Sequence, residues 1–152
     1  MLAKDIMTRE VITVSPDTPV TEVAEVLLEN RISGLPVVNA EGELMGVVSE
    51  ADLLYKEKDV KGPRTLSILG AIIYLERPQR LENELKKIAG AKVRDVMTKE
   101  VVTVHEDTPI HEIANVMIDR GINRVPVMRH KNLVGIITRA DIVRSLLSDH
   151  KA

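Results

Sequence analysis

The chain contains no cysteine, no tryptophan and no phenylalanine, and each absence excludes a class of function. Without cysteine there is no disulfide, zinc–thiolate site or thiol nucleophile. Tyr55 and Tyr74 are the only members of the Phe, Trp and Tyr group, so the base-stacking platforms of single-strand binders are missing. A formal net charge of −2 offers no basic face to a phosphate backbone. We therefore expect no nucleic-acid partner.

Long hydrophobic runs are missing as well. Lys4 and Asp5 fall where a signal peptide would need an apolar segment, and no stretch approaches the about 18 apolar residues of a membrane span. We therefore expect a soluble, cytoplasmic protein with no membrane partner. The hydrophobic content of 44% is enough for a core, which must be built from aliphatic side chains and methionine.

An internal repeat is the most informative feature that is present. Residues 5–38 align with residues 95–128 at an offset of 90 and share 16 identities in 34 positions. After a one-residue deletion in a turn the offset becomes 89, and the stretch GVVSEADLL from Gly46 matches GIITRADIV from Gly135. This similarity predicts a duplicated structural unit.

Both copies show the same order of expected elements. A β-rich run leads to Asp-Thr-Pro, where Thr18 and Thr108 are expected to cap a helix that starts at Pro19 or Pro109. The helix carries apolar residues at the i, i+3, i+4, i+7 spacing of one face. A last helix starts near residue 50 or 139. The expected strands lie at 11–14, 35–39 and 44–49 in the first copy and at 101–104, 125–129 and 133–138 in the second.

These elements predict an α+β fold made of two β-α-β-β-α repeats. One unit of about 50 residues buries too little surface to be stably folded alone. We therefore expect the copies to pack sheet to sheet about a pseudo-twofold axis, which generates clefts in pairs.

Residues 58–92 belong to neither copy. The charged run that ends at Gly62-Pro63 predicts a loop, and the apolar run at 65–76 is too short to span a bilayer. Pro78 is expected to open a helix that buries Leu81, Leu85 and Ile88 and ends at Gly90. We favour a helical hairpin that covers the pair or a dimer partner; the alternative is a lid or an effector-contact element. The predicted domains are 1–57, 58–92 and 93–152.

Reaction chemistry is not indicated by any motif. No glycine-rich phosphate loop is present. His105 and Glu106 precede His111, but the two histidines are six residues apart with Pro109 between them, which does not fit the zinc-binding HExxH pattern. No serine or threonine has a histidine–acid constellation suggested by the sequence. We expect no metal site, no catalytic residue and no enzyme activity.

The strand-to-helix corner recurs in both copies, with Ser49 and Asp52 matched by Thr138 and Asp141. This spacing fits an N-cap and an N3 residue, and an N3 acid can reach back as in a capping box. The same pair could bind a ligand, because an Asp beside a hydroxyl can accept hydrogen bonds from both hydroxyls of a vicinal diol such as ribose. The residues leave both interpretations open.

Taken in order, the motifs Asp-Ile/Val-Met-Thr, Asp-Thr-Pro, Ile-x-x-x-Pro-Val and the corner resemble the CBS (cystathionine β-synthase) domain, present twice as a CBS pair or Bateman module. The resemblance covers about three quarters of the chain. It implies that the sheets of the two repeats dock and that adenine nucleotides or S-adenosylmethionine bind in clefts between the repeats. The hydroxyl residue and the Asp of the corner would hold ribose.

Carried over by position, the resemblance assigns site residues to two clefts. One would be formed by Ile12, Thr13, Leu35, Pro36, Ser49 and Asp52. The other would be formed by Val102, Thr103, Asn123, Arg124, Val125, Pro126, Thr138, Arg139 and Asp141. Without Phe or Trp, an adenine ring would lie between aliphatic walls.

The two expected clefts differ in charge. Arg124 precedes the Pro-Val strand of the second copy, whereas Gly34 stands at the matching position of the first. Arg124 resembles the phosphate-contacting arginine of nucleotide-sensing CBS pairs such as the regulatory subunit of AMP-activated kinase; the alternative is a solvated arginine before an edge strand. Arg139 likewise stands where the first copy has Glu50. The second cleft is therefore expected to favour a phosphorylated ligand.

The resemblance implies a stand-alone regulatory module that binds AMP, ADP or ATP as a regulatory ligand rather than a cofactor. It would form a homodimer through its CBS pairs and signal by a conformational or oligomeric change to an effector protein. The alternatives are a structural oligomerisation module with vestigial clefts and an S-adenosylmethionine binder.

Overall fold

The computed structural model describes residues 1–55, 65–68, 71–74 and 91–149. The chain divides into two compact units, which are described separately below. We call Thr13–Ala40 with Met45–Glu100 the first-copy unit, and Met1–Ile12 with Glu41–Leu44 and Val101–Ala152 the second-copy unit. No helix in the described ranges is long and apolar enough to cross a membrane.

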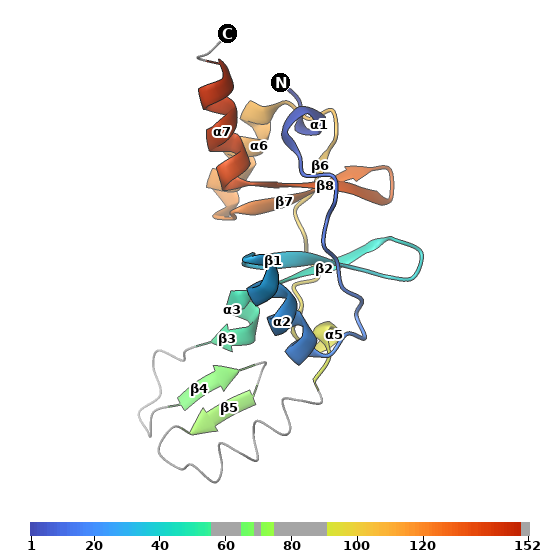
Figure 1. The fold of residues 1–152 in the computed structure, drawn as a ribbon, viewed down its shortest axis with the longest axis vertical. Helices are drawn as coiled ribbons and strands as arrows, with labels where there is room; N and C mark the ends of the chain where they lie inside the picture. Colours follow the sequence, from blue (N-terminus) through green and yellow to red (C-terminus); the bar gives the residue numbers. More distant parts are fainter. Residues whose placement is uncertain (56–64, 69–70, 75–90, 150–152) are drawn as a thin grey trace. The chain divides into compact units, whose positions relative to one another are not determined.

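The second-copy unit follows the predicted β-α-β-β-α order (Figure 1). Its three-stranded sheet has the order β6-β7-β8, in which β6 runs parallel to β7 and β8 runs antiparallel to it. The elements are β6 Val104–His105, α6 Ile110–Arg120, β7 Arg124–Arg129, β8 Asn132–Thr138 and α7 Arg139–Asp149.

The first-copy unit repeats this order with two reductions. Its first strand shrinks to a single parallel bridge between Val14 and Val37, and its last helix spans four residues where α7 spans eleven. The elements are α2 Val20–Asn30, β1 Gly34–Val38, β2 Leu44–Ser49 and α3 Glu50–Leu53, which continues into β3 Leu54–Tyr55.

The predicted starts of the long helices are wrong by one residue. The helices begin at Val20 and Ile110, and Pro19 and Pro109 are extended N-cap residues without a side-chain cap. The two threonines close the preceding turns instead: Thr18 Oγ1 accepts a hydrogen bond of 3.0 Å from the N–H of Ser15, and Thr108 makes the matching bond. Because Pro19 and Pro109 are the N-cap residues, Thr18 and Thr108 lie one position too early to cap the helices.

Each unit is completed by a short helix that precedes the other copy in the chain. In the second-copy unit, α1 (Ala3–Ile6) contacts the turn before α6, where the Ala3 N–H donates to the Thr108 carbonyl at 2.8 Å. In the first-copy unit, α5 (Val93–Val96) contacts the turn before α2, where the Val93 N–H donates to the Thr18 carbonyl at 3.0 Å. The compact units therefore divide the chain differently from the predicted boundaries at 57 and 93.

The cores are aliphatic, with methionine, as the composition requires. The first-copy unit buries Val23, Leu27, Leu35, Val37, Val48 and Val93. The second-copy unit buries Ala3, Met7, Val104, Ile113, Met117, Val125, Val127 and Ile137. The exchanged helices thus supply core residues as well as hydrogen bonds.

Two glycines allow the exchanged segments to approach the sheets. A Cβ at Gly46 would lie 2.7 Å from the Thr98 carbonyl oxygen and 3.0 Å from Met97 Sδ. A Cβ at Gly135 would lie 2.5 Å from Met7 Sδ. Glycine at the start of each corner motif is therefore a packing requirement, which explains its recurrence in both copies.

The prediction of a helical hairpin between the copies is wrong where the structure describes this segment. Thr65–Ile68 (β4) and Ala71–Tyr74 (β5) form an antiparallel pair, and β3 adds to β4. A short apolar run fits a strand as well as a helix, and periodicity alone cannot separate them. The predicted loop through 56–64 and the predicted helix from Pro78 to Gly90 lie outside the described residues.

Candidate functional site

We call Thr138–Asp141 the second corner; it lies where β8 ends and α7 begins. The Asp141 Oδ2 accepts hydrogen bonds from the Thr138 N–H at 2.8 Å and from the Thr138 hydroxyl at 3.0 Å. In return, the Asp141 N–H donates to Thr138 Oγ1 at 3.4 Å. This is the reciprocal arrangement of a capping box, so the structural interpretation of the motif is confirmed here.

The other carboxylate oxygen of Asp141 has its own partner. Arg144 Nη1 donates to Asp141 Oδ1 at 3.0 Å, from the next turn of α7. Asp141 is 8% exposed, whereas the Arg144 side chain is 71% exposed. The second corner therefore holds a nearly buried carboxylate whose charge is balanced by a solvated arginine.

Ser49–Asp52, the first corner, repeats half of this arrangement. The Asp52 Oδ2 accepts from the Ser49 N–H at 2.8 Å and from the Ser49 hydroxyl at 3.2 Å. Asp52 is only half-buried, and within the described part of the chain no hydrogen bond or ion pair reaches its Oδ1. Tyr55 stands at the position that matches Arg144.

The β7–β8 pairing brings further predicted site residues to the second corner. Arg124 is the cross-strand partner of Thr138, and Pro126 is the partner of Ile136. The Arg139 N–H donates to the Asn123 carbonyl at 2.9 Å, which fixes Asn123 at the start of α7. In the first-copy unit the Glu50 N–H makes the same bond to Ser33 at 2.9 Å. The residues that precede each Pro-Val strand thus lie at the corners, as expected.

Leu35 and Val125 are corrections to the predicted site. Both side chains lie in the cores of their units, with exposed fractions of 1% and 0%. Successive strand side chains point to opposite faces, so Val125 faces away from the side shared by Arg124 and Pro126. These two side chains therefore pack in the cores, while Arg124, Pro126 and Thr138 lie on the other face of the sheet; Pro36 and Pro126 are buried as well.

The residues of the first strands divide unequally. Val104 pairs with Val127 in parallel, which brings the preceding Val102 and Thr103 alongside the start of β7. The Val14 N–H donates to the Pro36 carbonyl at 3.2 Å, so Thr13 lies beside Pro36 in the first-copy unit. Ile12 belongs to the second-copy unit and is 39% exposed. The structure therefore does not group Ile12 with the first corner.

A model of the CBS domain matches residues 3–59 and 93–148. This chain belongs to the CBS domain family. The two matched ranges contain both corners and both exchanged helices, so the duplication is that of a CBS pair.

Full-length relatives of this CBS pair are known. The chain is 33% identical over 155 residues to the uncharacterized protein MJ1426 of Methanocaldococcus jannaschii, with 97% of this chain and 92% of that protein covered. Other curated relatives are longer. This chain spans 58% of the CBS domain-containing protein CBSX1 of Arabidopsis thaliana and 23% of the inosine-5′-monophosphate dehydrogenase of Methanocaldococcus jannaschii.

Two solved CBS pairs contain ligands. CBSX2 of Arabidopsis thaliana, solved in complex with AMP, is 28% identical with a TM-score of 0.73, and 98% of each chain is covered. The CBS pair of MJ0100, solved with 5′-methylthioadenosine and S-adenosyl-L-methionine, is 26% identical with a TM-score of 0.69 and the same coverage. Both structures establish the mixed α+β fold of this chain as that of a CBS pair.

Arg144 is the residue that sequence reasoning missed. The signal for it in the sequence was an arginine three residues after the corner Asp, a spacing that places two side chains on one helix face. In the sequence of this CBS pair, Arg124, Arg139 and Arg144 of the second copy stand where the first copy has Gly34, Glu50 and Tyr55. The charge difference between the corners is therefore larger than the sequence-based prediction.

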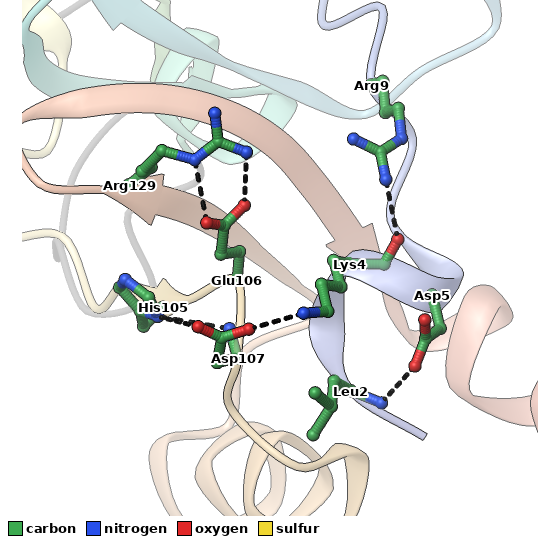
Figure 2. Close-up of polar contacts among 8 residues, drawn as sticks. All are labelled: Leu2, Lys4, Asp5, Arg9, His105, Glu106, Asp107 and Arg129. Atoms are coloured by element: carbon green, nitrogen blue, oxygen red, sulfur yellow. Dashed lines mark hydrogen bonds and ion pairs between the residues drawn. The ribbon is translucent and has the colours of Figure 1, made fainter.

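A second polar cluster fastens α1 to the second CBS repeat (Figure 2). Asp107 Oδ1 accepts from Lys4 Nζ at 2.9 Å, and the Glu106 carboxylate accepts from Arg129 Nε and Nη2 at 2.8 and 2.7 Å. We call these four residues the acid clasp. The hydrogen bond from Arg129 holds the pKa of Glu106 below its ordinary value, and that from Lys4 does the same for the pKa of Asp107.

Next to the two acids of the clasp lies His105, a histidine that the sequence analysis considered for a metal. The ligand atoms of His105, Glu106 and Asp107 lie within 4.8 Å of one another. Each acid already accepts from a cation, and His105 Nδ1 accepts the Asp107 N–H at 3.2 Å. These bonds assign the cluster to the attachment of α1. The first CBS repeat has a counterpart in the ion pair of Arg94 with Asp17.

Proposed function

We propose that this CBS pair is a regulatory protein that binds an adenine nucleotide, AMP, ADP or ATP, at its corners. The observation that carries the proposal is the second corner: a nearly buried Asp141, bonded to the hydroxyl of Thr138, whose cross-strand partner is Arg124. CBS pairs of the same fold, solved with AMP and with S-adenosyl-L-methionine, support this class of ligand.

The chemistry of the second corner suits a nucleotide in three parts. Asp141 has acceptor capacity beyond its cap bonds, because an ionised carboxylate offers about four lone-pair sites, and the ribose diol supplies two donors. Arg124 and Arg139 provide cations for the phosphate, which an arginine fork recognises by charge and geometry. The adenine ring would pack on aliphatic side chains such as Val102, which is partly exposed.

Regulation requires that the ligand distinguish two arrangements of the protein, because a ligand shifts an equilibrium only by its difference in affinity for the two states. A homodimer formed through the CBS pairs, and an effector protein that senses its change, would supply the output. Binding of AMP in competition with ATP would make this an energy-sensing module.

Calorimetric and thermal-shift titrations with AMP, ADP, ATP and S-adenosylmethionine test the proposal. A nucleotide at one hundred times its dissociation constant should stabilise the fold by about 2.7 kcal/mol. Arg124→Ala should weaken AMP binding by about tenfold, because a charge-assisted hydrogen bond is worth roughly 1.5–3 kcal/mol. If no adenine compound binds, the proposal is wrong.

A structural oligomerisation module is the second candidate, and one observation favours it. Leu28 and Ile118 occupy matching positions on α2 and α6, and they are 80% and 78% exposed. Apolar residues repeated at one place on both long helices indicate a contact surface. Sedimentation of Leu28→Glu and Ile118→Glu, with and without AMP, separates the candidates: an oligomer that depends on these residues but never on nucleotide favours the structural role.

S-adenosylmethionine remains the alternative ligand for the first corner. The matching positions carry Gly34 and Glu50 rather than arginine, which suits a ligand without phosphate. Titration of Asp52→Ala with S-adenosylmethionine would show whether this corner binds it.

A further inference from the structure

The carboxylate of Asp141 is shared between two tasks through its two oxygens. Oδ2 belongs to the cap, where the Thr138 N–H and hydroxyl both donate to it. Oδ1 belongs to Arg144, whose Nη1 donates at 3.0 Å. A diol that approaches this Asp must therefore compete with Arg144 for Oδ1, while the cap can stay intact.

Among the residues that the structure describes, the first corner presents no such competition. Asp52 makes the same two cap bonds through Oδ2, but its partner position holds Tyr55 instead of an arginine. Two aspartates with the same backbone setting thus differ in whether Oδ1 already has a cation. The difference comes from the residue type at this position and from the length of the helix, because α3 ends at Leu53 and Tyr55 lies in β3.

The Arg144 pair can be exchanged at small cost. The Arg144 side chain is 71% exposed, against 9% for Asp141, so water and salt screen the pair from the arginine side. Once a diol has taken Oδ1, however, Arg144 is left without the carboxylate that balanced its charge. A ligand with a phosphate replaces that negative charge, whereas a ligand without one does not.

We propose that Arg144 is a specificity-determining residue of the second corner: it holds Asp141 Oδ1 in the free protein, releases it to the ribose diol, and then pairs with the phosphate of the ligand. The inference rests on the proposed nucleotide function and adds a selection step to it. Arg144 disfavours nucleosides, because it competes with their diol, and favours nucleoside phosphates, because it gains a partner from them.

The ratio of adenosine to AMP dissociation constants measures this selection directly. Calorimetric titrations of the whole chain would compare the wild type with Arg144→Met, which keeps the length of the aliphatic stem and removes the charge. Arg144→Met should bind AMP about tenfold more weakly and adenosine up to about fivefold more tightly, so the ratio falls at least tenfold. Arg144→Lys should restore most of the ratio, because it restores the charge.

Arg94→Met is the matched control, since it removes an arginine from the exposed pair with Asp17 at the turn before α2. Its adenosine-to-AMP ratio should stay within about twofold of the wild type. Thermal unfolding of each variant confirms that it folds, and Arg144→Gln replaces Arg144→Met if the latter does not.

The outcomes separate this inference from the function on which it rests. A wild type that binds neither adenosine nor AMP overturns both. A wild type that binds AMP, together with an Arg144→Met ratio equal to the wild-type ratio, overturns the role of Arg144 and leaves the nucleotide function standing. Weakening of both ligands by the same factor shows a purely structural residue and also overturns it.

Discussion

The two corners have the same backbone pattern and opposite electrostatic surroundings. In both, a strand ends at a hydroxyl residue and a helix starts at the next residue. The N–H of the hydroxyl residue donates to Oδ2 of the Asp at 2.8 Å. Around this shared frame the second corner has Arg124, Arg139 and Arg144, and the first has Gly34, Glu50 and Tyr55. Duplication has kept the bonds that position the Asp and changed the charges that a ligand would meet.

The comparison also separates the two tasks of the corner Asp. The cap uses Oδ2 in both copies, so the structural task does not depend on what happens at Oδ1. A residue can therefore stabilise its helix and bind a ligand without compromise, provided that the tasks fall on different atoms. The alternatives of cap and binding site are compatible in this motif.

The glycines before the corners offer the strongest test of the shared frame. Gly46→Ala should destabilise the protein by about 3 kcal/mol, because the new methyl meets the Thr98 backbone carbonyl, which cannot rotate away. Gly135→Ala should cost about 1–2 kcal/mol, because Met7 Sδ and Cγ can move with the side-chain rotamer, whereas Met7 Cβ, at 3.0 Å, cannot. Urea unfolding measures both.

Gly42→Ala is the control for these variants, since Gly42 has open space around it and a φ of +80°. It should cost about 1 kcal/mol through backbone conformation alone. A larger loss for Gly135→Ala than for Gly46→Ala would contradict the expected order, in which the Met7 side chain moves aside more easily than the Thr98 carbonyl.

Removal of the corner aspartates tests the difference in function. Asp141→Ala should weaken AMP binding by about 100-fold, since it removes hydrogen bonds to a charged acceptor that are worth roughly 1.5–3 kcal/mol each. Asp52→Ala should change AMP binding much less, because its corner lacks the arginines. The two variants are matched controls for each other in calorimetry. The reverse ranking would assign the phosphorylated ligand to the first corner.

Removal of the corner hydroxyls sharpens the comparison of the caps. Thr138→Ala should destabilise the fold by about 1 kcal/mol, because Thr138 Oγ1 both donates to Asp141 and accepts its N–H. Ser49→Ala should cost a few tenths of that value, because Ser49 only donates to Asp52 and α3 is one turn long. Differential scanning calorimetry distinguishes them; equal losses would show that α7 does not use its cap.

The smallest expected effect is the loss at low pH of the stability that the acid clasp contributes. Folding lowers the pKa values of Glu106 and Asp107 from 4.5 and 3.8, so their contribution is present above those values and is lost as the pH falls through the lowered ones. The melting temperature of the wild type should therefore drop more between pH 5 and pH 3 than that of Glu106→Gln. Lys4→Met should show the same reduced dependence through Asp107. An unchanged acid profile in both variants would exclude the clasp as a source of acid sensitivity.

Features with a long periodic signal were predictable from the sequence. The apolar spacing of 20–30 and 110–120 predicted α2 and α6, and alternation predicted β1, β2, β7 and β8 within a residue or two. The repeat predicted two equivalent corners, and the hydroxyl–Asp spacing predicted their cap. These features depend on residues that are close in sequence or paired across one hairpin, so a local sequence pattern is enough to predict them.

The missed features depend on contacts between distant segments. Four residues of α1 or α5 are too few to show a helical period, and their exchange between copies depends on contacts about one hundred residues apart, such as Lys4 with Asp107. The core position of Val125 depends on the register of β7 with β8. The strands β4 and β5 form because they pair with each other, which a single apolar run does not reveal. Arg144 was visible in the sequence, but the family motif ends at Asp141.

The exchanged helices have a consequence for the origin of the chain. A fragment cut at residue 57 keeps α1 but loses the turn that α1 contacts, and it keeps the turn before α2 but loses α5. Because α1 and α5 make equivalent bonds to equivalent turns, two identical single copies could complete each other by trading helices. Fusion of two such copies into one polypeptide would turn an association that depends on concentration into an intramolecular one.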